Sequence, residues 1–573
     1  MKTDKQQIVR RSAAVFCTAL TLGTITCAAA LAAPAPPDSG SILEETKRPA
    51  ILEREKPLPP AIKVQEPKPD KALDDVQPIE VRSFRITGEL PVAEAELQAV
   101  LKAEINKKHT LKGLNELAHR LTVHMREQGN MLSFAFIPAQ QIKDGVVEIG
   151  IVAGKYGKVE IRNKSWLRGF MLPGIFSSVK SGGVIKTSQL ERALLLADDL
   201  PGAEVRGTLA PGASPGSADL TVEAADKDRI NAALYVDNWG SRYTGRVRTG
   251  LQLSLNSVIG IGDSLTLGGL TSFDGLDNYD FGYSAYAGTS GLKLSARHSR
   301  TNYSLGDIFA DMKANGTANI TSVEAAYPLL RSRRLNLNAS LGYDYKDLSD
   351  DMDSVQSHVS KTDHIWHIGL SGNLNDNLLG GGANSMSMTY SRGELAINDA
   401  TARDNDTTTA QTAGSFGKFN LNLRRQQQLI PDLQLHLSFA GQLADKNLDS
   451  SEKFYLGGPS GVRAYPQSEA PGDMGYRITA ELRYRVAPLS TSRTSLFANG
   501  FFDCGGVRTN KHLWSGATGK NDRHLSGAGI GLLWALDKYA ALRMDYAWKT
   551  TNDAATSDRD KSGQLWLQGV FYY

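Results

Sequence analysis

One arginine and one aspartate could form an ion pair, although an arginine in a loop rich in glycine and proline is ordinarily solvated. Arg463 lies in FYLGGPSGVRAYPQSEAPGDMGY, residues 454–476, a stretch with five glycines, three prolines and no regular apolar period. Asp503 lies in FFDCG, residues 501–505. A guanidinium and a carboxylate match bidentately, so a loop that folds back onto a strand would join these groups. A solvated arginine at a loop tip is the ordinary alternative.

Catalytic chemistry finds little support in the residues. There is no H-E-x-x-H, no G-x-S-x-G and no phosphate-binding glycine loop that ends in Lys. His364 and His367 are three apart in a region with strand periodicity, which places them on opposite faces. The aspartates of residues 344–353 are interpreted as a solvated external loop rather than a cation site. We expect no catalytic residue, no metal and no cofactor, and a barrel phospholipase or protease stays a minor alternative.

The elements that must position the two charges are strands. From Arg229 to the C-terminus, short runs alternate between apolar and polar residues, which is the period of a strand with one apolar face. At roughly 20 residues per strand and connection, this region supplies about 16 membrane-spanning strands. The clearest run puts Tyr476, Ile478, Ala480, Leu482, Tyr484 and Val486 on one face, and Arg477, Thr479, Glu481, Arg483 and Arg485 on the other. Lipid outside and water inside a transmembrane antiparallel barrel require such a pair of faces.

Alternation within the barrel also places the two motifs. Asp503 shares a face with Asn499 and Phe501, and we assign this face to the lumen. The loop that carries Arg463 could reach Asp503 by folding back into the barrel, with Tyr465 stacked nearby.

The N-terminal residues predict export. Positive charges precede an uncharged run over residues 12–33, and Ala30-Leu31-Ala32 is a small-x-small cleavage site, so residues 1–32 are interpreted as a secretory signal peptide. Its removal brings the formal charge from +3 to zero, which gives no basic bias toward nucleic acid. It also leaves Cys504 as the single cysteine, so no disulfide framework is expected.

Residues between the signal peptide and the barrel fall into three parts. Residues 33–76 are rich in proline and charge, which predicts a periplasmic linker with at most a short helix at residues 41–48. Residues 77–153 and 154–228 share one order of predicted elements, a strand, then helix, then a hairpin. Each is therefore expected to be a small α+β domain. In the first, Leu114, Leu117, Leu121 and Met125 form one helix face. The barrel follows over residues 229–573.

Several strings, in this order, resemble the two-partner secretion transporters of the TpsB type, a haemolysin/adhesin secretion-activation family with polypeptide-transport-associated (POTRA) domains. LLLADDLPGAEV at 194–205 resembles the end of the family's second POTRA domain, and YVDNWGSRYTG at 235–245 its first barrel strand. LGGPSGVRAYP resembles the sixth extracellular loop with its V-R-G-Y motif, and FFDCG fits the partner motif F-x-D-x-G. The C-terminal QLWLQGVFYY resembles the closing strand read by the barrel-insertion machinery.

The resemblance implies a set of site residues. They are the loop motif Val462, Arg463, Ala464 and Tyr465, the barrel partner motif Phe501, Asp503 and Gly505, and the insertion signal Phe571 and Tyr573. Ala464 stands where the family has glycine, so a positive φ at this position would be strained. The linker lacks a long helix, and whether this chain has the plug helix described in some family members stays open.

The resemblance also implies function and location. We expect an outer-membrane translocator of a Gram-negative bacterium that captures an unfolded exoprotein through periplasmic POTRA domains, by β-augmentation, and secretes it through the barrel. The expected partners are a large exoprotein with an N-terminal secretion domain, outer-membrane lipids and lipopolysaccharide, and the insertion machinery; the transporter itself is expected to be a monomer. A barrel-assembly factor is the main alternative and a diffusion porin the next. The cargo stays open among an adhesin, a cytolysin and a haem-binding protein.

Overall fold

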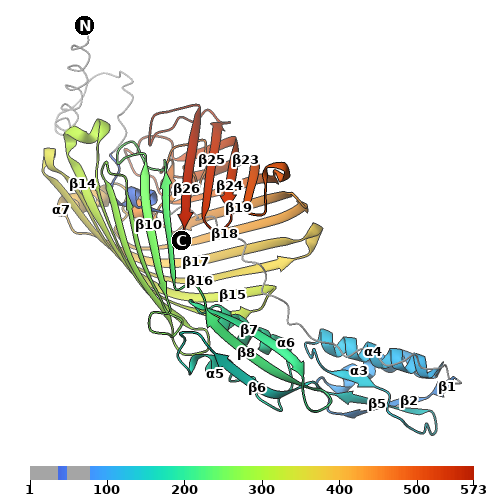
Figure 1. The fold of residues 1–573 in the computed structure, drawn as a ribbon. Coiled ribbons are helices and arrows are strands. Elements are labelled where there is room, and N and C mark those ends of the chain that lie inside the picture. The colour runs from blue at the N-terminus through green and yellow to red at the C-terminus, as the bar shows by residue number, and fades with distance from the viewer. Residues whose placement is uncertain (1–35, 48–77) are drawn as a thin grey trace.

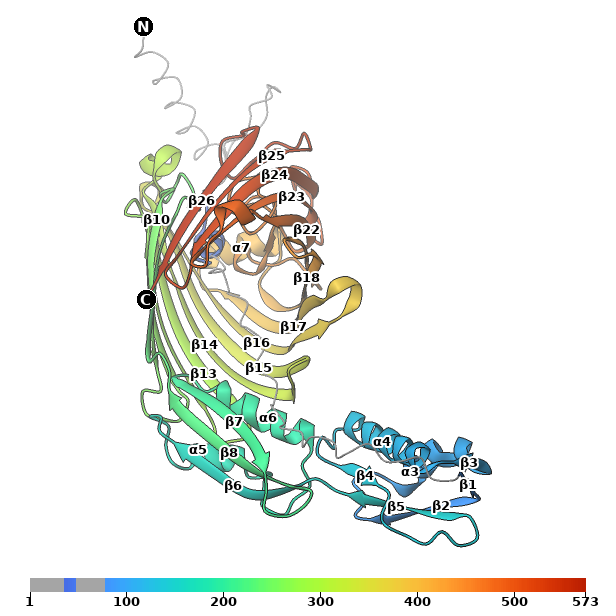
Figure 2. The same cartoon turned by 45° about the vertical axis from the view of Figure 1, so that its right-hand side comes forward.

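The computed structural model describes residues 36–47 and 78–573. Two α+β domains lie in series at one end of a large barrel (Figures 1 and 2). We call this end of the barrel the near end, and the opposite end, which carries α7, the far end. The predicted signal peptide lies outside the described residues. Within the described ranges, no helix has the length and hydrophobicity needed to cross a membrane.

The first α+β domain packs two helices on a three-stranded sheet. In the sheet β5 is central, with β2 parallel and β4 antiparallel to it, and β1 pairs separately with β3. Leu114, Leu117, Leu121 and Met125 are buried on one face of α4, as the spacing predicts. The elements are β1 Ile79–Val81, β2 Ser83–Gly88, α3 Glu94–Leu101, η1 Lys102–Glu104, β3 Lys107–His109, α4 Leu111–Glu127, β4 Phe134–Phe136 and β5 Val146–Val152.

The second α+β domain has the same sheet arrangement with a separate core. Here β8 is central, β6 is parallel to it and β7 antiparallel. The short helix α5, which the periodicity does not predict, contributes Met171, Leu172 and Ile175 to the core. The elements are β6 Lys155–Asn163, α5 Met171–Ile175, α6 Thr187–Asp198, β7 Ala203–Pro211 and β8 Ser217–Asp226.

Sixteen antiparallel strands close the barrel, in agreement with the predicted fold class. The order is β9 to β19, then β22 to β26, with β26 pairing back onto β9. The strands are β9 Ile230–Asp237, β10 Arg248–Asn256, β11 Ser264–Thr271, β12 Leu276–Tyr286, β13 Lys293–Ser304, β14 Ala314–Arg331, β15 Leu335–Met352, β16 Ser357–Asp376, β17 Gly382–Ile397, β18 Gly414–Ile430, β19 Leu433–Ala444, β22 Met474–Arg485, β23 Thr494–Arg508, β24 Asp522–Leu536, β25 Ala540–Lys549 and β26 Gly563–Tyr572.

Alternation gives the barrel an apolar outward face, and β22 shows it most clearly. On β22, Tyr476, Ile478, Leu482 and Tyr484 are exposed outward, while Glu481 is buried in the lumen. The connections at the far end are longer and carry η2 Asp307–Met312, η3 Asp353–Val355, α7 Ala400–Thr408, η5 Ser450–Glu452 and the hairpin of β20 Phe454–Tyr455 and β21 Pro471–Gly472. The connections at the near end are short and include η4 Leu378–Gly380 and η6 Ala487–Leu489.

Two predictions about loops are wrong. Of the acidic residues expected in an external loop, all but Asp353 of η3 lie on β15, which continues to Met352, and Asp350 faces the lumen. Residues 39–46 form helix α2 inside the barrel, although the composition of residues 33–76 predicts a periplasmic linker. The reason in both cases is tertiary: Ser39 donates its backbone N–H and its hydroxyl to the two oxygens of Asp350, at 2.6 and 3.0 Å, so each segment gives the other a buried partner.

Candidate functional site

The loop between β19 and β22 folds back into the lumen and carries the predicted motif with it. Val462, Ala464 and Tyr465 are fully buried, and Arg463 is 3 % exposed. Together with Leu456 of the same loop, the three apolar residues form a core with Phe501, Val507 and Leu525 of the barrel wall. Within the loop, the backbone N–H of Val462 donates to the carbonyl of Leu456 at 2.7 Å. The loop is therefore a packed part of the barrel interior rather than a solvated tip.

Arg463 forms a bidentate ion pair with Asp503. Nε donates to Oδ2 at 2.8 Å and Nη2 to Oδ1 at 3.0 Å, and the backbone N–H of Arg463 donates to Oδ2 at 3.2 Å. Thr479 of the neighbouring strand donates its hydroxyl to Oδ1 at 2.8 Å. Asp503 is completely buried, so it depends on these donors for the stability of its charge.

Two further carboxylates complete the site, and the sequence did not single them out as partners of Arg463. Nη1 donates to Glu481 at 2.8 Å and to Asp545 at 3.4 Å. Arg483 binds Glu481 at 2.7 Å, and Arg543 binds Asp545 at 2.8 Å. Three guanidinium groups thus face three carboxylates. A balanced network of this kind avoids the large cost of an unpaired buried charge.

Phe501, not Tyr465, stacks on the guanidinium. Its ring centroid lies 3.3 Å from Cζ of Arg463. The expectation for Tyr465 is therefore corrected: its hydroxyl bonds the Thr551 hydroxyl at 2.9 Å and donates to the carbonyl of Asp553 at 3.0 Å. Tyr465 thus fastens the loop to the connection between β25 and β26. Trp566 of β26 adds another tie by donating its indole N–H to the carbonyl of Arg463 at 2.7 Å.

Glycines on the wall make room for the loop and for the wall side chains that contact Arg463. Gly527, Gly529 and Gly531 alternate on the lumen face of β24, where added Cβ atoms would collide with Ala464, the Phe501 ring and the Asp545 carboxylate respectively. Gly505 is also constrained, because a Cβ there would lie 2.8 Å from Leu456 of the loop. The φ angle of Ala464 is not positive, so alanine at this motif position carries no strain of the kind that would require glycine.

Helix α2 lies across the lumen against the same loop. Asp38 caps the helix and accepts a hydrogen bond from the Ser450 hydroxyl at 2.6 Å, and the Gln467 amide donates to the carbonyl of Glu44 at 3.1 Å. At its other side, Glu45 accepts from the Thr244 hydroxyl at 2.6 Å. Ile42 is fully buried among lumen residues that include Tyr303. The helix and the loop therefore fill the lumen together.

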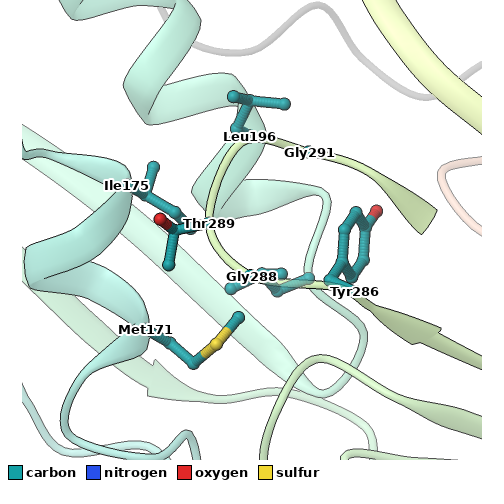
Figure 3. Close-up of a pocket in the computed structure, with 8 residues that line it drawn as sticks. Met171, Ile175, Leu196, Tyr286, Gly288, Thr289 and Gly291 are labelled. Carbon is teal, nitrogen blue, oxygen red and sulfur yellow. The ribbon is translucent and has the colours of Figure 1, made fainter.

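The second α+β domain is docked under one side of the near rim. Arg331 at the end of β14 binds Asp199 with two hydrogen bonds of 2.7 Å, and the backbone N–H of Arg333 donates to Glu191 at 3.0 Å. Figure 3 shows the turn after β12 inserted between α5 and α6, with Thr289 beside Ile175 and Tyr286 at the edge of a small pocket. The domain thus contacts the β10–β15 side of the rim.

The C-terminal strand closes the barrel and exposes its aromatic end. Phe571 and Tyr573 are 50 % and 87 % exposed on the outward face, together with Leu565 and Leu567. The backbone of Tyr573 also pairs with Ala232 of β9, with N–H to O distances of 2.9 and 3.2 Å. Tyr573 therefore combines an exposed side chain with a backbone position in the closing seam.

Comparisons with known proteins agree with this geometry. Residues 216–533, more than half of the chain, match the profile of the haemolysin secretion/activation proteins ShlB/FhaC/HecB, and residues 79–154 match the ShlB-type POTRA domain. Among curated proteins, the heme/hemopexin transporter protein HuxB of Haemophilus influenzae strain 86-028NP is 27 % identical over 84 % of each chain. The outer membrane transporter CdiB of Dickeya dadantii is 22 % identical, over 77 % of this chain and 79 % of that protein.

A solved structure has the same fold. CdiB from Escherichia coli superposes with a TM-score of 0.71 at 18 % identity, covering 91 % of this chain and 94 % of that one. The likeness spans the α+β domains and the barrel together.

Proposed function

The chain belongs to the haemolysin secretion/activation family of ShlB, FhaC and HecB, and we propose that its loop of residues 445–473, anchored by Arg463, organises the export path. The protein is an outer-membrane translocator of the two-partner secretion type, with its POTRA domains in the periplasm and its barrel as the pore. The near end of the barrel is thus periplasmic. The observation that supports the loop's role is the burial of Arg463 on Asp503, Glu481 and Asp545.

The proposed path begins at the free edges of the POTRA sheets. In the second domain, β7 is nine residues long and is the outer strand of its sheet beside α6. An extended segment of the exoprotein would add to such an edge through backbone hydrogen bonds, with side-chain pockets supplying selectivity. Since this domain sits under β10–β15, the other side of the rim is the proposed entrance to the lumen. Export then requires the loop and α2 to make room while Arg463 keeps its anchor.

The partner is a secreted exoprotein. We propose that it is a single large protein with an N-terminal secretion domain, and the similarity to a protein named heme/hemopexin transporter makes a haem-binding exoprotein the first candidate among the three cargo classes. Deleting the gene should remove one large protein from the culture supernatant and leave the other secreted proteins unchanged. Quantitative mass spectrometry of the supernatant, with the intact gene restored as control, measures this. An unchanged supernatant would contradict the assignment; broad loss of outer-membrane barrels would favour an assembly factor.

We also propose that Phe571 and Tyr573 form the signal for the barrel-insertion machinery, and that the transporter works as a monomer in contact with phospholipid and lipopolysaccharide. Deleting Tyr573 should lower the amount of heat-modifiable protein in the membrane. Because the deletion also removes the backbone pair with Ala232, two substitutions separate the causes. Tyr573→Phe should insert normally, and Tyr573→Ser should be as poor as the deletion. Normal insertion of Tyr573→Ser would limit the role of this residue to closing the seam.

A further inference from the structure

Apolar side chains stand at the tips of the periplasmic turns. Leu378 and Leu379 between β16 and β17 are 62 % and 78 % exposed, and Leu489 and Tyr539 on later turns are also exposed. Turns that face water favour Gly, Asn, Asp, Ser and Pro. Apolar and aromatic tips at this level of a transmembrane barrel fit the interfacial zone of the bilayer.

The turn between β10 and β11 also has an apolar tip. Val258 and Ile259 are exposed at its tip. Asp263 holds the turn in shape, because its carboxylate accepts the backbone N–H groups of Ile259, Gly260 and Ile261 at 3.1 to 3.3 Å. The outward-facing residues nearest to this turn are apolar. Leu255 of β10 pairs with Ile230 of β9 on one side and with Leu265 of β11 on the other. The apolar tip is therefore a fixed extension of the lipid-facing surface.

The second POTRA domain adds two aromatic residues to this tip. Trp166 and Phe170 are 56 % and 58 % exposed, which is unusual for large side chains on a water-facing domain. Arg168 between them ties the segment to the turn: its backbone N–H donates to the carbonyl of Gly260 at 2.7 Å, and its Nε to that of Ile259 at 2.9 Å. The two exposed pairs thus form one surface, Trp166, Phe170, Val258 and Ile259, which we call the rim patch.

Basic side chains border the rim patch. Lys164 and Arg168 are exposed, and Cζ of Arg229 lies 4.6 Å from the centroid of the Trp166 ring. Two acidic residues, Asp226 and Asp228, lie just before Arg229 in the sequence. Asp226 accepts a hydrogen bond from the backbone N–H of Trp166 at 2.8 Å, and Asp228 is exposed. Indole rings and arginines next to aliphatic tips suit the boundary between acyl chains and phosphate headgroups.

We propose that the rim patch binds the inner leaflet of the outer membrane, so that the second POTRA domain is itself a peripheral lipid-binding domain. The partner is phospholipid: its acyl boundary receives the aromatic and aliphatic side chains, and its phosphates face Lys164, Arg168 and Arg229. Lipid then holds the domain on the β10–β11 side, while Arg331 and Asp199 hold it on the β14–β15 side. The domain keeps one orientation under the pore through both attachments.

Depth-dependent fluorescence quenching tests this inference on the full chain in lipid vesicles. In a Cys504→Ser background, each of the variants Trp166→Cys, Phe170→Cys and Ile259→Cys carries an environment-sensitive fluorophore. Phospholipids brominated near the headgroup end of the acyl chain should quench all three positions at least about twofold more than a label at Phe136, an exposed aromatic of the first POTRA domain.

A label at Leu267, on the outward face of β11, shows in the same samples that the barrel is in the bilayer. A negative result at the rim patch therefore counts against this inference and not against the location of the barrel. Quenching at 166 and 170 no stronger than at 136 would overturn the proposal. So would quenching that appears only at 259, since the POTRA domain would then stand off the membrane. Crosslinking of residue 166 to the exoprotein instead of lipid would assign the patch to cargo.

Discussion

A variant that lacks residues 77–153 should insert into the outer membrane at a normal level and export no detectable exoprotein. On the proposed path, recognition by the first POTRA domain precedes threading through the pore, and the barrel makes its strand pairings without this domain. The second domain also keeps its core, since the buried cluster around Leu190 and Val222 is separate from the cluster around Leu121 and Val147. Exoprotein in the supernatant measures export, and heat-modifiable protein in the membrane measures insertion.

The deletion also removes contacts to the second domain, because Met131 and Leu132 pack against the core of that domain. Leu121→Asp provides the matched variant: it places a charge in the core of the first domain only and keeps residues 131–132. Both variants should lose export and should fail to bind the N-terminal part of the exoprotein. Export at the normal rate by either one would contradict capture at the first domain.

Much of the fold could be predicted because it follows from local periodicity. Period two over residues 229–573 indicated the barrel and about 16 strands, and the helical spacing of Leu114 to Met125 indicated the face of α4 that is buried. Alternation also placed Asp503 in the lumen. Helix α2 was missed as a part of the barrel because its partners are remote in the sequence: Asp38 bonds Ser450, and Glu45 bonds Thr244.

The rest of the site depends on the register of the closed barrel. Thr479 pairs with Asp503, Asp503 with Gly527, and Gly531 with Asp545, so the three carboxylates converge only once β22 to β25 are aligned. Two signals were nevertheless present. Glu481 was on the polar face of the predicted strand, and alternation of Met544 and Tyr546 leaves Asp545 on the lumen side. The glycines at 527, 529 and 531 repeat with the same period two.

Arg463→Ala should leave an inserted barrel and reduce secretion at least about tenfold. The substitution leaves the buried Asp503 carboxylate with Thr479 as its remaining side-chain donor. Losing one partner of a buried ion pair costs about 3 to 5 kcal/mol. Glu481 and Asp545 keep Arg483 and Arg543. The destabilised loop should therefore leave its place on the wall while the barrel stays folded. Arg485→Ala is the matched control, since this arginine is half exposed and its guanidinium lies 4.0 Å from Asp432, its one ion-pair partner among the described residues.

Steric displacement of the loop should reproduce this defect with every charge in place. Gly527→Val puts a side chain where Ala464 packs, whereas a Cβ added at Gly500, on the neighbouring strand, meets no atom of the described residues within 4 Å. We expect secretion to fail in the first variant and to be normal in the second, because Gly500 is exposed on the outward face of β23, away from the loop. Increased cleavage of the loop by protease would show that the loop has moved in Gly527→Val and Arg463→Ala alike.

The pairing itself is tested by a double-mutant cycle. Asp503→Ala should impair secretion less than Arg463→Ala or equally, because Arg463 keeps its contacts to Glu481 and Asp545 when Asp503 is gone. In the double variant no unpaired aspartate remains, so its secretion should be no lower than that of Arg463→Ala alone. Strictly additive losses in secretion would mean that the two residues act independently. Full secretion by Arg463→Ala would return this residue to the role of an ordinary loop arginine, because the energy of its buried contacts would then have no consequence for export.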